Sequence, residues 1–271
     1  MSQQTPQGSI ATQRVLFRLP GMDEVTVRRD VEFPAADGAT LRLDLYQPPG
    51  ARGGRPLPAV IVGEGYPEEG FERVVGCRFR DMGPVVSWAR LIAASGMAVV
   101  VGSNRAPAED ARALLRFVRS AAGTLGIDAS RIGVWAASGN APTGLSLLME
   151  EGPDPLACAA FCYPFLLDLD GATYVAEAAA VYHFVDACAG RSIADLPGAT
   201  PILLARAGRE ETPHLNESLD AFVSRALGRN LPLTLVNHAE GPHAFDLFHD
   251  SAETRAVVGQ VLEFLRSRLL A

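Results

Sequence analysis

Residues 131–141 read RIGVWAASGNA, a short apolar run that ends in one serine, Ser138, among small residues. This pattern predicts a buried strand that enters a tight turn, with the serine at its apex and a helix behind it. The apex residue has a strained backbone, so the positions two before and two after it are normally glycines. Ala136 and Asn140 stand there instead. The stretch therefore predicts a nucleophilic serine on a degenerate form of the G-x-S-x-G motif.

Strand-sized apolar runs alternate with helical patterns along the rest of the chain. Two alternating runs around Asp37 and Gly38 predict an antiparallel hairpin at a sheet edge. Further buried strands are expected at 58–62, 97–102, 156–163, 201–207 and 231–236. The alternation predicts an α/β fold, in which a mainly parallel twisted sheet of about eight strands has helices on both faces.

The chain shows no internal repeat and no interdomain linker, so we expect one domain over residues 21–271. Residues 1–20, rich in Gln, Ser and Thr, predict a mobile or loosely packed arm. Residues 63–83 are expected to form a loop, and whether 67–83 closes over a substrate is left open. The segment 168–196 predicts two short helices beside a pocket, with no large inserted cap.

Composition excludes several classes of partner. A net charge of −7 argues against nucleic acid and against an anionic membrane surface. No apolar run has the length of a membrane span, and the polar first residues do not form a secretory leader. The four cysteines have no metal-ligand spacing, and the apolar surroundings of Cys158 and Cys162 predict buried free thiols. We therefore expect a cytoplasmic protein.

A base is needed to activate the serine, and His243 is the candidate. It stands just after the last expected strand, in a turn made by Gly241 and Pro242. Chemistry in open α/β sheets collects at this carboxyl edge of the strands. Histidine accepts a serine proton near neutral pH and returns it to a leaving group. The other histidines are more easily explained as structural or solvated.

An acid that orients the histidine is expected after the strand 201–207. Glu210 and Glu211 follow that strand, and either carboxylate can accept the imidazole N–H. We choose Glu210 for its position in the loop and keep Glu211 as the alternative. The other glutamate would then lie at the start of the next helix, where negative charge is favourable.

An oxyanion hole needs two N–H groups directed at the developing negative oxygen. Gly139, directly after the serine, supplies one. The second is expected from the loop after strand 58–62, where Gly65 is the first candidate. Tyr66 is the alternative, through its N–H or its hydroxyl. Glu64, beside them, could hold a water or a polar group of the substrate.

Three segments together resemble the α/β-hydrolase superfamily: residues 131–140 (RIGVWAASGN), 208–213 (GREETP) and 241–245 (GPHAF). They are most similar to the dienelactone-hydrolase-like and small carboxylesterase branch, and the likeness spans the chain from about residue 25. A His-Gly-Gly-Gly loop is missing, so the hormone-sensitive-lipase-like branch is not indicated.

The resemblance implies the triad Ser138, Glu210 and His243. Dienelactone hydrolases use cysteine as nucleophile, so the serine favours general ester hydrolysis. We expect a serine carboxylesterase with a shallow pocket that takes short-chain acyl esters. The alternatives are a lactone, dienelactone, thioester or peptide hydrolase with the same triad, and a catalytically silent binding protein. No cofactor is implied, the expected partner is a small ester, and a homodimer is left open.

Overall fold

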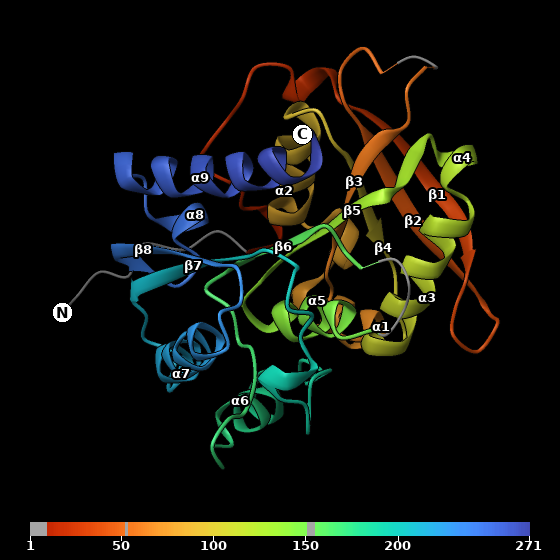
Figure 1. The fold of residues 1–271 in the computed structure, drawn as a ribbon. Helices are drawn as coiled ribbons and strands as arrows, with labels where there is room; N and C mark the ends of the chain where they lie inside the picture. Colours follow the sequence, from red (N-terminus) through yellow and green to blue (C-terminus); the bar gives the residue numbers. More distant parts are fainter. Residues whose placement is uncertain (1–9, 52–53, 151–154) are drawn as a thin grey trace.

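The computed structural model describes residues 10–51, 54–150 and 155–271, and its centre is one eight-stranded sheet (Figure 1). The strand order is β1-β2-β4-β3-β5-β6-β7-β8. The strands are β1 (Thr26–Pro34), β2 (Thr40–Gln47), β3 (Leu57–Val62), β4 (Ala98–Gly102), β5 (Ile127–Ala137), β6 (Cys158–Cys162), β7 (Ile202–Arg209) and β8 (Leu233–Pro242). The β1–β2 and β2–β4 pairs are antiparallel and the other five are parallel. The predicted mainly parallel α/β sheet is confirmed.

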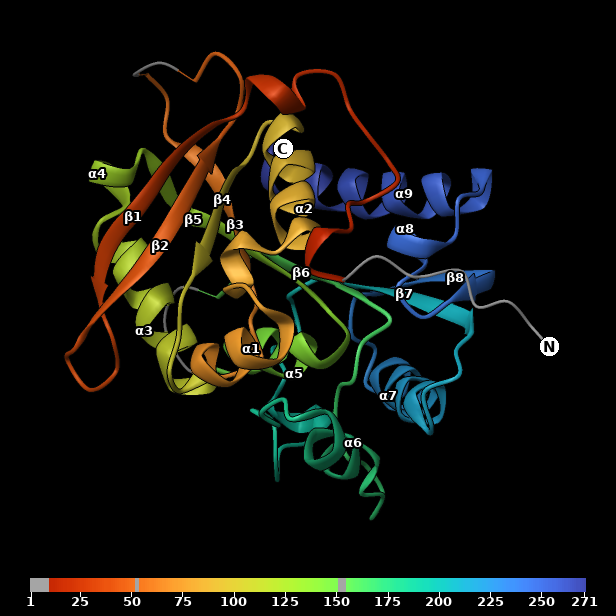
Figure 2. The ribbon, with the colours of Figure 1, turned by 180° about the vertical axis from the view of Figure 1, so that it is seen from behind.

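Helices cover both faces of the sheet, as Figures 1 and 2 show. One face carries α2 (Gly83–Ala94) and α9 (Ala252–Leu269), and the other carries α3 (Pro107–Ser120), α5 (Ala141–Leu148) and α7 (Leu215–Gly228). Each face has its own apolar core, and every residue of β4 and β6 is buried. Burying one Val, Leu or Ile side chain contributes roughly 1.5–3 kcal/mol. These cores fix the central strands.

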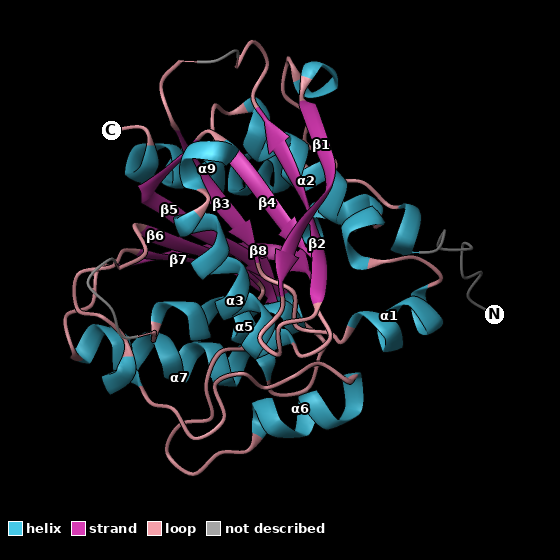
Figure 3. Ribbon diagram, turned by 90° about the vertical axis from the view of Figure 1, so that its right-hand side faces the viewer, coloured by secondary structure: helices cyan, strands magenta, loops and turns pink. Residues whose placement is uncertain are grey.

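Shorter helices lie in the connections: α1 (Glu68–Val75), α4 (Ala122–Leu125), α6 (Tyr174–Tyr182) and α8 (Phe245–Phe248). Figure 3 shows α1 and α6 near one another at one end of the molecule. The expected loop 63–83 thus contains a helix, because Glu68 and Glu69 supply the negative charge that favours a helix start. In segment 168–196 the structure has α6 and a single 3-10 turn (Ile193–Asp195). Among the described helices, none is long and apolar enough to cross a membrane.

Residues 10–20, the described part of the expected loose arm, are hydrogen-bonded to α2 and α8. Val15 is buried, and its N–H donates to the Ser87 hydroxyl on α2 (3.0 Å). The N–H of Leu16 donates to the carbonyl of Asp246 at 2.9 Å. Apolar side chains among the polar ones give this segment enough buried surface to dock. Residues 1–9 lie outside the described part.

The four cysteines are free thiols, and Cys158 and Cys162 are buried as expected. Burial raises the pKa of Cys158 to about 12 and that of Cys162 well above its usual value. Both side chains therefore act as small apolar groups of the core.

Candidate active site

Four neighbouring strands place one side chain each at the same edge of the sheet. Ser138 directly follows β5, Tyr163 follows β6, Glu210 follows β7 and His243 follows β8. Adjacent strands lie roughly 4.8 Å apart, so groups at consecutive strand ends come within reach of one another. The site is thus a direct consequence of the strand order.

Ser138 has the strained backbone that a nucleophile turn requires, with φ of 55°. The missing glycine at position 136 is compensated by glycines that face it. A Cβ on Gly63 would lie 3.1 Å from the Cβ of Ala136, and one on Gly144 would lie 3.3 Å from it. The space normally left by a glycine in the motif is therefore supplied by the residue that follows β3 and by α5.

Asn140, the second departure from the motif, has an ordinary helical backbone (φ −85°, ψ −16°) and needs no glycine there. Its side-chain oxygen accepts the N–H of Gly65 at 2.8 Å. A Cβ on Gly65 would lie 2.3 Å from the carbonyl oxygen of Gly139, so only glycine allows this approach. Asn140 therefore ties the serine turn to the loop after β3.

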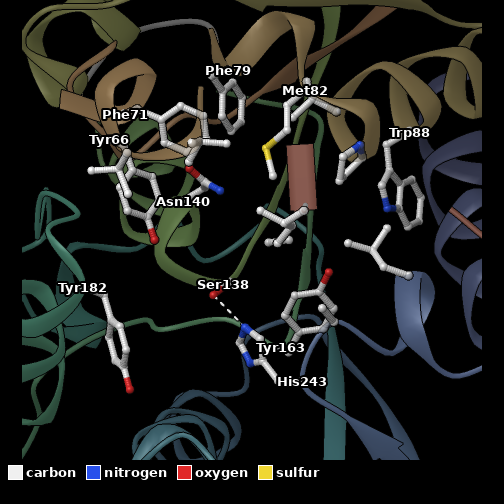
Figure 4. Close-up of a pocket in the computed structure, with 18 of the residues that line it drawn as sticks. Tyr66, Phe71, Phe79, Met82, Trp88, Ser138, Asn140, Tyr163, Tyr182 and His243 are labelled. Atoms are coloured by element: carbon white, nitrogen blue, oxygen red, sulfur yellow. Dashed lines mark hydrogen bonds between the residues drawn. The ribbon is translucent and has the colours of Figure 1, made fainter. Parts of the chain in front are cut away.

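The structure brings Ser138, His243 and Glu210 into one chain of hydrogen bonds (Figure 4 shows the first). Ser138 Oγ lies 2.9 Å from His243 Nε2, and His243 Nδ1 lies 2.6 Å from Glu210 Oε2. With Nδ1–H donating to the carboxylate, Nε2 is the acceptor for the serine hydroxyl. Glu211 is exposed and does not join this chain.

The carboxylate of Glu210 is held in its charged form. Burial of its side chain opposes ionisation, but the hydrogen bond and charge of His243 outweigh it and lower the pKa of Glu210. The N–H of Thr212 adds a hydrogen bond to Oε1 at 2.8 Å. An ionised carboxylate at this position fixes the imidazole tautomer and stabilises its charged form.

A buried network under the histidine was not found by sequence reasoning. The Tyr163 hydroxyl and Trp88 Nε1 each donate to Asp246 at 2.7 Å. The Tyr163 ring lies 4.8 Å from the ring of His243. Burial raises the pKa of Asp246, and these two donors offset part of that rise. The signal in the sequence was slight, an aspartate three residues after His243.

The loop after β3 differs from the expected oxyanion hole. The N–H of Gly65, the first candidate, already donates to the side-chain oxygen of Asn140, so of the two expected donors only Tyr66 is unengaged among the described residues. Neither the N–H nor the hydroxyl of Tyr66 has a hydrogen-bond partner among the described residues. Burial raises the pKa of Tyr66 to about 12, which keeps the hydroxyl a donor. A Cβ on Gly139 would lie 2.7 Å from that hydroxyl, so the two residues are in close contact.

Glu64 does not line the cavity over Ser138. Together with Asn104 it lines a separate cavity of about 20 Å³. Neither carboxylate oxygen has a hydrogen-bond partner in the described part of the chain. Burial, and next the charge of Glu68, raise the pKa of Glu64 well above its usual value.

Among the described residues, no group of three or more His, Cys, Asp or Glu is placed to hold a metal ion.

A cavity of about 570 Å³ opens over Ser138, which is larger than the shallow pocket we expected. Figure 4 shows Ser138 and His243 at its base, below a wall of aromatic rings. The named side chains of that wall are mostly apolar: Tyr66, Phe71, Phe79, Met82, Trp88 and Tyr163. The connections α1 and α6 and the start of α2 enclose the space without an inserted cap domain.

The sequence matches no protein-family model and no curated protein. Solved structures do match the fold. Brefeldin A esterase, a bacterial homologue of human hormone-sensitive lipase, is 17% identical, with TM-score 0.71 over 97% of this chain and 82% of its own. An esterase of Pyrobaculum calidifontis is 20% identical, with TM-score 0.68 over 91% and 87%. A bacterial heroin esterase is 20% identical, with TM-score 0.68 over 92% and 86%.

These structures are esterases, and one is a homologue of hormone-sensitive lipase, so the predicted dienelactone-hydrolase-like branch is not supported. At 17–20% identity the likeness establishes architecture. The strand order, the serine turn after β5 and these matches agree: the chain has the α/β-hydrolase fold.

Proposed function

We propose that this protein is a serine carboxylesterase, which hydrolyses esters through an acyl-enzyme. The observation that carries the proposal is the hydrogen-bonded chain from Ser138 through His243 to Glu210, at 2.9 and 2.6 Å. The strained backbone of Ser138 adds support, since strain of this kind persists where the surroundings enforce it. The similar solved structures are esterases, which points the same way.

The geometry gives each group a role. His243 Nε2 takes the proton of Ser138 as the serine oxygen bonds to the ester carbonyl carbon. The negative oxygen that forms accepts hydrogen bonds from the Gly139 N–H and from Tyr66. When this tetrahedral intermediate collapses, the bond between its carbon and the alcohol oxygen breaks. The alcohol leaves with the proton from His243. Water, deprotonated by His243, then attacks the acyl-enzyme and releases the acid.

A larger substrate than the expected short-chain acyl ester is proposed. The expectation of short-chain acyl esters depended on a shallow pocket, and a cavity of about 570 Å³ removes that reason. We propose that the bond cleaved is an ester, and not a lactone, thioester or peptide bond, because the similar structures are esterases.

Replacement of the nucleophile tests the proposal. Ser138→Ala should lower the hydrolysis of p-nitrophenyl butyrate by roughly 10⁴-fold or more, because the other groups cannot form an acyl-enzyme. Ser130→Ala is the matched control, since Ser130 is exposed, its hydroxyl donates to Asp128 at the start of β5, and it does not line the cavity. Turnover by Ser138→Ala at the wild-type rate would overturn the proposal.

A further inference from the structure

The cavity over Ser138 has space and surface that hydrolysis of a small ester does not need. Its volume of about 570 Å³ lies within the roughly 300–1,000 Å³ of pockets that bury drug-sized ligands. An acetyl group would leave most of that space filled with water against apolar walls. Such water is released when an apolar ligand group replaces it.

The far wall of the cavity is apolar and belongs to the buried core. Met82, Val85 and Trp88 come from the start of α2 and the residue before it, Trp135 from β5, and Leu247 from α8. All five side chains are buried, and the rings of Trp88 and Trp135 lie 4.5 Å apart. Core packing of this kind keeps the wall in place, so the space is present before a ligand arrives.

The apolar lining continues to the mouth of the cavity. Ile10 is 44% exposed, Val74 on α1 is 83% exposed and Tyr182 at the end of α6 is 45% exposed. Large apolar side chains at the rim of a pocket mark a surface that meets an apolar ligand. The lining is therefore continuous from the core wall to the solvent.

We infer that the substrate is an ester with a bulky apolar group, of aryl or medium-chain alkyl size, which fills this cavity. The inference rests on the proposed esterase function and specifies its substrate class. Each buried methylene is expected to raise kcat/KM about fourfold, which corresponds to roughly 0.8 kcal/mol, until the cavity is filled. The aromatic rings of Phe71, Phe79 and Trp88 can also stack on a flat aryl group.

A series of p-nitrophenyl esters tests the inference, with the acetate, butyrate, octanoate and 4-phenylbutyrate compared at the same concentration of active sites. The octanoate and the phenylbutyrate should exceed the acetate at least tenfold in kcat/KM. A preference for the acetate, with a steady decline toward longer acyl groups, would overturn the inference. Reaction of Ser138 with a fluorophosphonate probe is scored separately, so failure of the esterase proposal itself stays distinguishable.

Two neighbouring valines on α2 offer a matched pair of variants. Val85 lines the cavity, whereas Val86 does not. Val85→Phe should lower the octanoate-to-acetate ratio of kcat/KM at least tenfold, because the ring occupies the space for the acyl chain. Val86→Phe should leave that ratio unchanged. An unaltered ratio in folded Val85→Phe would contradict the inference.

Gly70 on α1 provides a second filler if Val85→Phe fails to fold. It lines the cavity, and a Cβ there meets nothing within 4 Å, so a side chain is tolerated. Gly70→Leu should lower the same ratio about threefold or more. The inference would be overturned if Gly70→Leu gave the same octanoate-to-acetate ratio as wild type and the same kcat/KM for every ester of the series.

Discussion

The base and the walls of the cavity are built in different ways. The base consists of residues that directly follow β5, β6, β7 and β8, so their positions are fixed by the sheet and by short hydrogen bonds. The walls come largely from connections, and α1 has no buried residue at all. Sheet order therefore positions Ser138, Glu210 and His243, whereas the connections set the size and lining of the cavity. The base should respond to single polar substitutions, and the walls to changes of volume.

The largest effect is expected at the base, from the two adjacent glutamates. Glu210→Gln removes the negative charge that His243 Nδ1 contacts at 2.6 Å, so kcat should fall roughly 10³–10⁴-fold. Glu211 is the next residue and its side chain is exposed, so Glu211→Gln should change kcat less than twofold. Equal losses in both variants, measured with p-nitrophenyl butyrate, would show that Glu210 is not the acid.

A smaller effect is expected where base and wall meet, at Tyr66. Tyr66→Phe removes a hydroxyl but keeps the ring and the N–H, so kcat should fall about 10–10²-fold with little change in KM. Tyr174→Phe is the control, because Tyr174 stacks on His214 and does not line the cavity. A rise in KM with kcat unchanged would make Tyr66 a wall residue and assign the oxyanion contact to backbone N–H groups alone.

The smallest effect is expected at Glu64, in the loop after β3, and it is an effect on stability. Its pKa is raised in the folded protein above 4.5, the value for an unperturbed glutamate. The wild-type protein therefore loses stability as pH rises through the folded-state pKa, because ionisation is easier after unfolding. Glu64→Gln lacks this loss, so its Tm should exceed that of wild type by about 2–4 °C per kcal/mol gained.

The pH dependence of that difference identifies its cause. The Tm of Glu64→Gln minus that of wild type should widen as the pH rises above about 4.5, the value for an unperturbed glutamate. Glu69→Gln, on an exposed side chain of α1, should show no such trend. A difference that is constant with pH would mean that the carboxyl of Glu64 does not resist ionisation.

The sheet and the three groups at its edge were predictable from sequence. Apolar runs of strand length fix the order of elements, and the groups that follow those runs must meet at one edge. Ser138, Glu210 and His243 all have this position, so local pattern was sufficient to select them. Glu210 was chosen over Glu211 for its position in the loop after a strand expected to end at residue 207, and β7 in fact ends at Arg209.

Contacts between distant segments were not predictable. The hydrogen bond from Gly65 to Asn140 joins residues 75 positions apart, and it engages the N–H that was the first candidate for the oxyanion donor. The bond from Trp88 to Asp246 spans 158 positions. The cavity size depends on how α1 and α6 pack beside the sheet, and no period or motif encodes that packing. Specificity is therefore harder to infer from this sequence than chemistry.

The most direct test of the central claim is covalent labelling with a fluorophosphonate, followed by peptide mapping. An activated serine reacts, and an ordinary hydroxyl does not. We predict one adduct per chain, on Ser138, that disappears in His243→Ala while the variant keeps its fold. Labelling elsewhere, or no labelling of the folded wild-type protein, would contradict the claim that the ends of four strands form a hydrolytic site.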